Sequence, residues 1–142
     1  MGTDIKTWAV DADGNDITDR GNWGDDIDCG YHREFPFDWR SYAMYGFLAG
    51  VRGYLDIEPI AQGRPWKDAP EFLKEGEECE ISVLGETWVS VDELSSFNYD
   101  IEVFNTQSHS MVNLRKFLGP DYFDNIEELK RIGADKVFMA FY

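Results

Sequence analysis

The sequence has few cysteines and histidines, and it lacks the common catalytic motifs. Its 142 residues include only two cysteines, Cys29 and Cys79, and two histidines. Nucleophilic catalysis needs a serine or cysteine with a base and an orienting group beside it, and the chain has no Gly-x-Ser-x-Gly motif. It also has no phosphate-binding glycine loop followed by Lys-Ser or Lys-Thr. A metal-dependent or hydrolytic enzyme is therefore the least favoured class of function, and we expect no cofactor.

Long apolar runs and export signals are also absent. The chain begins Met1-Gly2-Thr3-Asp4, which is polar and unlike a secretory signal. No apolar run approaches the roughly 20 residues that a membrane-spanning helix needs. We therefore expect a cytoplasmic protein with reduced thiols and no membrane partner. Oligomeric state is left open by the sequence.

Basic residues are outnumbered by acidic ones, 13 against 28, which gives a net charge of -15. The electric field of such a negatively charged protein repels nucleic acid and attracts basic surfaces. We therefore expect a protein partner with a basic surface and no direct nucleic-acid binding, although acidity can also serve solubility alone. One long surface loop, residues 11–28, holds the candidate partner-binding aspartates, which are Asp11, Asp13, Asp16, Asp19, Asp25, Asp26 and Asp28.

The pattern of apolar residues predicts one α+β domain spanning residues 1–142. Strands are predicted at 5–11 and 137–142, and an amphipathic helix at 121–132. A capping box at Ser90-Val91-Asp92-Glu93 opens another helix, and a further helix is predicted over 111–118, capped by Ser108 or Ser110. The two terminal strands are natural partners, so we expect a small antiparallel or mixed sheet that contains both termini.

The most apolar stretch predicts a central buried helix. Asp38 can act as its N-cap, apolar residues recur at helical spacing as far as Leu55, and the helix ends near Gly50 or Gly53. Because apolar residues cover almost every face, we expect burial on most sides. Gly46 and Gly50 leave a smooth strip that another backbone can approach closely.

Two metal motifs are incomplete. A calcium loop that starts at Asp11 needs glycine at its sixth position and glutamate at its twelfth, where the chain has Asp16 and Asn22. Cys29 and His32 have the spacing of half a zinc motif, but Cys79 and His109 are not clustered as a second pair. We therefore predict no metal site.

The polar residues of the central helix are candidates for ligand binding. Arg40 and Arg52 are predicted about 3.3 turns apart on this helix, with Tyr42 between them. Arginine pairs with phosphate and aromatic rings stack on bases. The structural alternative is that Arg40 bonds the acidic loop and Arg52 meets the last carbonyls of the helix.

The chain resembles the small, uncharacterised proteins of bacteriophages, prophages and some bacteria that begin Met-Gly-Cys-Asp-Ile-His. The resemblance spans nearly the whole chain, and none of its motifs is a catalytic signature. It rests on Met1-Gly2-Thr3-Asp4-Ile5-Lys6, Arg40-Ser41-Tyr42, Leu48-Ala49-Gly50-Val51-Arg52-Gly53, Pro59-Ile60, Gly63-Arg64-Pro65, Thr87-Trp88-Val89-Ser90 and Gly133-Ala134-Asp135-Lys136-Val137.

The resemblance implies a phage origin and a shared fold more than an activity. The cysteine and histidine near the start of the family are Thr3 and Lys6 here, so chemistry that uses those groups is not expected. Trp88 joins Arg40, Tyr42 and Arg52 as a shared polar or aromatic position.

Two functions follow as expectations. The first is a non-enzymatic phage accessory protein that binds and inhibits a host protein in the host cytoplasm, either a defence system or a nucleic-acid enzyme, as a nucleic-acid mimic does. The second is a small-ligand binder, for a nucleotide, that uses Arg40, Tyr42, Arg52 and Trp88.

Overall fold

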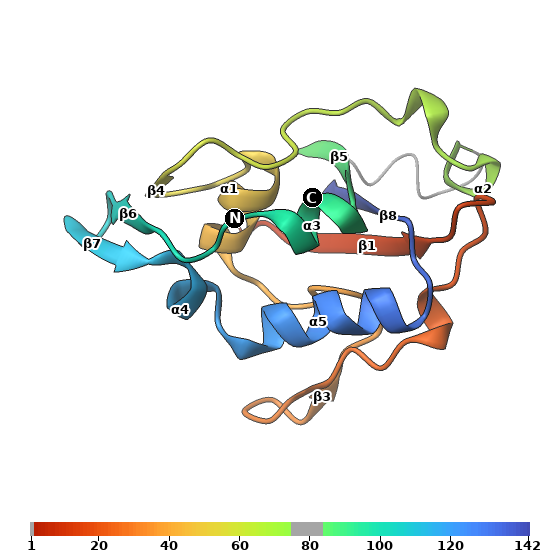
Figure 1. Ribbon diagram of the computed structural model, residues 1–142, viewed down its shortest axis with the longest axis horizontal. Coiled ribbons are helices and arrows are strands. Elements are labelled where there is room, and N and C mark those ends of the chain that lie inside the picture. The colour runs from red at the N-terminus through yellow and green to blue at the C-terminus, as the bar shows by residue number, and fades with distance from the viewer. Residues whose placement is uncertain (1, 75–83) are drawn as a thin grey trace.

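The computed structural model describes residues 2–74 and 84–142, and Cys79 therefore lies outside the described residues. Those residues form an α+β fold in which small antiparallel sheets are combined with helices, as predicted (Figure 1). None of the helices in the described ranges is long and apolar enough to cross a membrane.

In chain order, the strands and helices are β1 (Ile5–Val10), η1 (Thr18–Arg20), β2 (Asp25–Asp26), β3 (Tyr31–His32), α1 (Tyr42–Ala49), β4 (Leu55–Asp56), η2 (Trp66–Asp68), α2 (Glu71–Lys74), β5 (Gly85–Ser90), α3 (Val91–Ser96), β6 (Glu102–Asn105), β7 (Ser110–Asn113), α4 (Leu114–Leu118), α5 (Pro120–Arg131) and β8 (Lys136–Phe141).

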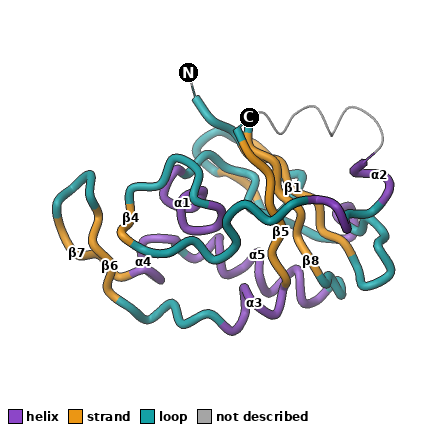
Figure 2. Tube along the Cα trace, turned by 90° about the horizontal axis from the view of Figure 1, so that it is seen from above, coloured by secondary structure: helices purple, strands orange, loops and turns teal. Residues whose placement is uncertain are grey.

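The main sheet joins the two ends of the chain, as predicted. Its order is β1-β8-β5, with both pairs antiparallel. Beyond the strands, the backbone N–H of Asp4 donates to the carbonyl of Tyr142 at 2.7 Å, and the termini lie side by side in both views (Figures 1 and 2). Strand β8 is the central strand of this sheet. The two faces of the sheet contact two separate apolar clusters.

Side-chain alternation along β8 builds those two layers. Val137, Met139 and Phe141 belong to the larger cluster, which includes residues of α1 and α5, whereas Phe138 and Ala140 belong to the smaller one. Since successive strand residues point to opposite faces, an apolar strand can serve both layers. The predicted strand at 137–142 is confirmed as Lys136–Phe141, whose residues 137–141 are buried on both faces, whereas Tyr142 is 44% exposed.

The central helix is buried but shorter than predicted. The N-cap of α1 is Ser41, whose hydroxyl accepts the N–H of Met44 at 3.2 Å. The prediction of Asp38 as N-cap is wrong, because its carboxylate instead accepts the Tyr31 hydroxyl at 2.9 Å and the Glu34 N–H at 3.0 Å. Consequently Arg40 precedes the helix, and Arg52 follows it at φ 60°, so they do not share one helix.

Glycine fixes the end of α1 and its closest contact. Gly50 caps the helix in the left-handed conformation, with φ 76°, which glycine adopts without steric cost. A Cβ on Gly46 would lie 2.1 Å from the Cα of Gly53. The predicted close backbone approach therefore occurs, and its partner is the chain's own turn after the helix.

The C-terminal half matches prediction in two helices and departs in a third. The Ser90 capping box opens α3, with both of its hydrogen bonds present, and α5 covers the predicted amphipathic stretch. The helix predicted over 111–118 is wrong in its first half, because Met111 and Val112 pair with β6 as strand β7. The N-cap of the remaining helix, α4, is Asn113 rather than a serine.

The acidic segment 11–28 is an ordered surface element rather than a plain loop. Trp23 and Ile17 are buried and anchor the segment to the core. The indole N–H of Trp23 donates to the carbonyl of Thr18 at 3.1 Å. The segment contains η1 and β2, and Asp16 forms an isolated bridge with Val10. All seven aspartates remain exposed or half-exposed.

Candidate functional site

A small hairpin carries three of the seven candidate aspartates, which are Asp25, Asp26 and Asp28. Strands β2 and β3 pair as Asp25 with His32 and Asp26 with Tyr31, and the hairpin projects beyond α5 in Figure 1. At its tip, the N–H of Cys29 donates to the Asp26 carboxylate at 3.3 Å. Gly30 follows with φ 63°, a left-handed turn position that suits glycine.

One buried amide holds this hairpin against α5. The Asn125 side-chain oxygen accepts the N–H of Phe37 at 2.8 Å, and its nitrogen donates to the carbonyl of Trp23 at 3.2 Å. Phe37 has φ 62°, a conformation that is uncommon for an aromatic residue. Asn125 therefore fixes both ends of the segment that contains the hairpin.

A groove of about 880 Å³ lies between the hairpin and the α4–α5 junction. Its walls come from residues 25–33, from residues 38–40 and from residues 118–121. Five carboxylates line it, against two arginines. The lining residues that matter below are Asp25, Asp26, Ile27, Asp28, Cys29, Tyr31, Arg33, Asp38, Trp39, Arg40 and Asp121.

Arg33 is buried at the centre of this region, with 7% of its surface exposed. Its Nη2 donates to the Asp121 carboxylate at 3.1 Å, and its guanidinium carbon lies 4.5 Å from the centroid of the Trp39 ring. The buried Nε–H has no hydrogen-bond partner among the described residues. A buried polar group of this kind costs about 1–3 kcal/mol when its hydrogen bond is unmade.

Two other carboxylates of the groove are committed to neighbours. The His32 Nδ1 lies 2.6 Å from a carboxylate oxygen of Asp25. Tyr31 donates to Asp38, and this hydrogen bond is the main reason that the pKa of Tyr31 rises to about 12. The same hydrogen bond orients the Tyr31 ring in the wall of the groove.

The remaining aspartates of the segment lack cationic partners. Of the seven aspartates at positions 11–28, only Asp25 forms an ion pair with another described residue. Residues 11–38 carry nine carboxylates and two arginines, a net charge of -7. Like charges placed this closely repel one another, and this repulsion lowers the stability of the fold. Asp11, Asp16 and Asp26 nevertheless accept hydrogen bonds from nearby backbone N–H groups.

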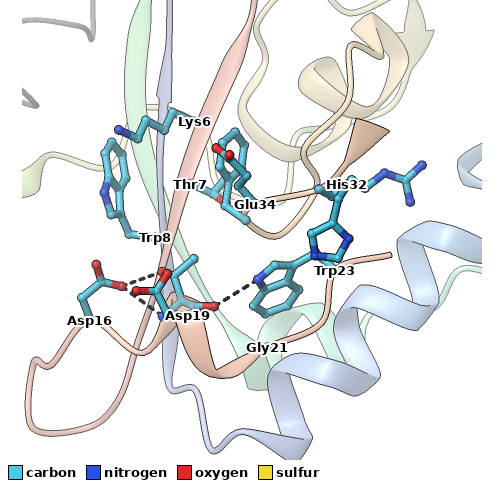
Figure 3. A pocket seen from close by; sticks show the side chains of 12 residues that line it. Lys6, Thr7, Trp8, Asp16, Asp19, Gly21, Trp23, His32 and Glu34 are labelled. Carbon is cyan, nitrogen blue, oxygen red and sulfur yellow. Dashed lines mark hydrogen bonds between the residues drawn. The ribbon is translucent and has the colours of Figure 1, made fainter. Parts of the chain in front are cut away.

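A second hollow of about 440 Å³ lies on the other side of the hairpin, against β1. Figure 3 shows Lys6 and Trp8 on one wall, His32 and Trp23 on the opposite wall, and Asp16 and Asp19 below. Within it the Asp16 carboxylate accepts the backbone N–H and the hydroxyl of Thr18. Arg33 also lines this hollow, so the arginine contacts both sides of the hairpin.

Three of the predicted ligand residues converge on the N-terminal segment. Arg40 donates to the Asp4 carboxylate at 3.1 and 2.8 Å, which raises the pKa of this arginine. The Tyr42 hydroxyl accepts the N–H of Thr3 at 3.1 Å, and Arg52 Nε donates to the Thr3 hydroxyl at 2.9 Å. These contacts tie both ends of α1 to the start of the chain.

The fourth predicted ligand residue, Trp88, lies elsewhere. It packs against the smaller cluster, on the face of the sheet opposite α1. Cations of Arg64 and Lys136 lie 4.8 and 4.9 Å from its ring centroid. The structure therefore brings Arg40, Tyr42 and Arg52 together and places Trp88 apart from them.

The described residues contain no group of three or more His, Cys, Asp or Glu side chains that could hold a metal ion. Cys29 lines the acidic groove, whereas His32 lines the hollow against β1. The two residues of the half zinc motif therefore face different sides of the hairpin.

Arg33 was not identified from the sequence. Its partner Asp121 is 88 positions away, and no local pattern connects the two. One signal was available, because Arg33 is one of only two basic residues among the nine acidic residues of the segment 11–38. An arginine in such acidic surroundings is a candidate for an ion pair.

Comparison with known proteins finds no matching family model, no match among curated proteins and no matching solved structure.

Proposed function

We propose that the protein is a phage-encoded accessory protein that binds and inhibits a host protein with a basic surface. The target is a component of a defence system or an enzyme that acts on nucleic acid. The acidic face occupies the basic surface that nucleic acid would otherwise contact. The phage origin rests on the sequence resemblance, and the mode of binding rests on the acidic segment.

One observation carries the proposal. Six of the seven aspartates at positions 11–28 form no ion pair with the described residues, yet buried side chains hold their segment in place. Ordered, uncompensated charge of one sign speeds and directs association with a surface of the opposite sign. A disordered tail would serve solubility equally well, so the ordering favours recognition.

Affinity capture with matched variants tests the proposal. The test variant changes four unpaired carboxylates of the acidic segment to amides, at Asp13, Asp19, Asp26 and Asp28. The control variant makes the same change in charge at four exposed residues outside the acidic segment. These are Asp56 on β4, Glu58 in the turn after β4, Asp92 on α3 and Glu102 on β6. Each protein is immobilised and exposed to host lysate at about 0.15 M ionic strength, where long-range attraction is already screened.

We expect wild type and control variant to retain the same basic protein, and the test variant to lose it. The captured protein, once purified, should act on nucleic acid and be inhibited by wild type. Equal recovery by test and control variants would contradict a specific acidic face, and recovery of no distinct protein by wild type would contradict the proposal as a whole.

A nucleotide-binding function is the second candidate. Arg40 and Tyr42 line a hollow of about 410 Å³ together with Ser41, Tyr54 and Gln107, which supplies an arginine and aromatic rings at one place. Thermal unfolding with and without nucleotides tests it. A nucleotide that binds the folded state must raise the unfolding temperature, so the absence of any increase rejects this function.

A further inference from the structure

Strand β7 forms an open edge of the three-stranded sheet β4-β6-β7. The hairpin that it makes with β6 lies at one end of the molecule in both views (Figures 1 and 2), and the β2–β3 hairpin lies elsewhere. We infer that β7 pairs antiparallel with β7 of a second copy of this chain, so that the two sheets join across a two-fold axis. This self-association is separate from the proposed function, which uses the acidic segment.

The backbone of β7 has hydrogen-bonding groups that point away from β6. Phe104 lies opposite Met111 in the ladder between the two strands, and three residues farther along the same register the N–H of Leu114 donates to the carbonyl of Ile101 at 2.9 Å. Because hydrogen-bonded and non-hydrogen-bonded pairs alternate in an antiparallel ladder, Met111 directs its N–H and C=O outward. None of the described strands lies on that side of β7. A strand from another chain can meet both groups.

The outer face of this hairpin supplies apolar surface beside the open edge. Met111 is 59% exposed and Phe104 is 36% exposed, and a non-hydrogen-bonded pair brings its two side chains close together. The His109 ring lies beside them, with its centroid 6.5 Å from that of the Phe104 ring. When Met111 of one copy faces Met111 of the other, a continuous row Phe104–Met111–Met111–Phe104 forms. This row buries apolar surface that a single copy exposes to water.

The edge lacks the features that normally keep sheet edges from pairing. Natural edge strands carry charged side chains, proline or a bulge. Residues 103–114 contain no Asp, Glu, Lys, Arg or Pro, and they are the longest run without charge in the sequence. The register between β6 and β7 is also continuous, without a bulge. Nothing in the sequence of this strand opposes the approach of another strand.

The local charge identifies the occupant as a second copy of the chain. Two copies with a net charge of -15 each repel one another over most of their surfaces. Residues 100–116 are an exception, because the two acidic residues Asp100 and Glu102 balance the two basic residues Arg115 and Lys116. A basic partner would find no surplus of negative charge here. A two-fold contact at β7 therefore avoids the like charges that other self-contacts would bring together.

Sedimentation equilibrium of the intact protein tests the inference, over protein concentrations of about 10 μM to 1 mM and at low and high salt. The test variant Met111→Lys places two like charges opposite one another at the two-fold axis. The control variant Ile27→Lys makes the same change in charge at another exposed apolar residue, between β2 and β3. Amide hydrogen exchange of wild type at both ends of the concentration range follows the Met111 N–H.

We expect wild type to dimerise with a Kd on the order of 100 μM, because a contact between two short strands is smaller than the interfaces of stable complexes. Dimerisation should strengthen at high salt, which screens the repulsion between the two acidic copies. Met111→Lys should weaken it at least ~tenfold, while Ile27→Lys should not weaken it. The Met111 N–H should exchange more slowly at high protein concentration.

A wild-type protein that stays monomeric across the whole range would overturn the inference. Equal weakening by Met111→Lys and Ile27→Lys would also overturn it, as would a dimer in which exchange of the Met111 N–H does not slow, because the contact would then lie on another surface. The proposed function is unaffected by these outcomes, since the capture experiment tests it separately.

Discussion

Two regions of the molecule are rich in charged side chains but use them in different ways. Around the N-terminal segment, Arg40, Tyr42 and Arg52 contact Thr3 and Asp4, which lie more than 35 positions away. Around the hairpin, most aspartates have no cationic partner among the described residues, and Arg33 has an unmet donor. The first region holds the fold together, and we propose that the second contacts a partner.

The contrast shows that charge alone does not identify a functional residue. A charged side chain whose hydrogen bonds are completed within the chain contributes to stability. One that is held in place without such partners contributes little to stability and is available to a ligand. Substitutions in the two regions should therefore separate stability from binding.

The largest effect on stability is expected at Asn125, whose side chain holds the segment with the acidic hairpin against α5. Asn125→Ala removes the partners of the Phe37 N–H and the Trp23 carbonyl, which are buried groups. We expect the free energy of unfolding to fall by about 2–3 kcal/mol, measured by urea denaturation. Asn98→Ala, which removes an exposed bond to the Asp100 N–H, should cost less than about 0.5 kcal/mol. Equal losses would contradict the role given to Asn125.

Glu93 tests the behaviour of a carboxylate that does have a partner. It accepts two hydrogen bonds from Arg64, both at 2.7 Å, and its pKa falls from 4.5 to about 2. A lowered pKa adds stability above the unfolded pKa, and that stability is lost as the pH falls from about 4.5 to about 2.

Glu93→Gln should therefore lower the free energy of unfolding at pH 7. Because 37% of the Glu93 side chain is exposed, solvent screens the ion pair, and we discount its contribution to about 1 kcal/mol. Urea denaturation across the acid range should show the difference from wild type shrinking below pH 4.5. A constant difference at every pH would contradict an ionic contribution.

Tyr42 tests the N-terminal region directly. Tyr42→Phe deletes the hydroxyl that accepts the Thr3 N–H and keeps the ring that packs against the core. We expect a loss of about 0.5–1 kcal/mol of stability, the ordinary value of one hydrogen bond, with no change in partner capture. Loss of capture by a stable Tyr42→Phe protein would move the binding site to this region.

The smallest effect is expected at Asp28. Asp28→Asn removes one unpaired charge from an acidic surface, so the free energy of unfolding should rise by about 0.3 kcal/mol at low salt. Differential scanning calorimetry at low and high salt provides the measurement, and the gain should disappear at high salt. A loss of stability would show that Asp28 has a structural partner.

The parts of the fold that the sequence predicted depend on neighbouring residues. The Ser90 capping box, the end of α1 at Gly50 and the amphipathic helix α5 each follow from contacts within one turn. Long-range contacts overrode local signals elsewhere. Asp38 has the chemistry of an N-cap, but Tyr31 and the Glu34 N–H bind its carboxylate, and pairing with β6 made a strand of residues 110–113.

The candidate site was predicted only in part, for the same reason. The seven aspartates were visible as a cluster in the sequence, and all are exposed or half-exposed in the structure. The groove itself requires Asn125 to hold Phe37 and Asp121 to hold Arg33, and both pairs are 88 positions apart. Spacing along the chain carries no sign of such contacts.

The most direct test measures binding and stability on one protein, the variant with amides at Asp13, Asp19, Asp26 and Asp28. If these carboxylates are held for a partner, the variant should unfold at the same or higher denaturant concentration than wild type and should no longer capture the basic partner. A variant that is less stable than wild type and still captures the partner would contradict the division between a structural region and a binding region.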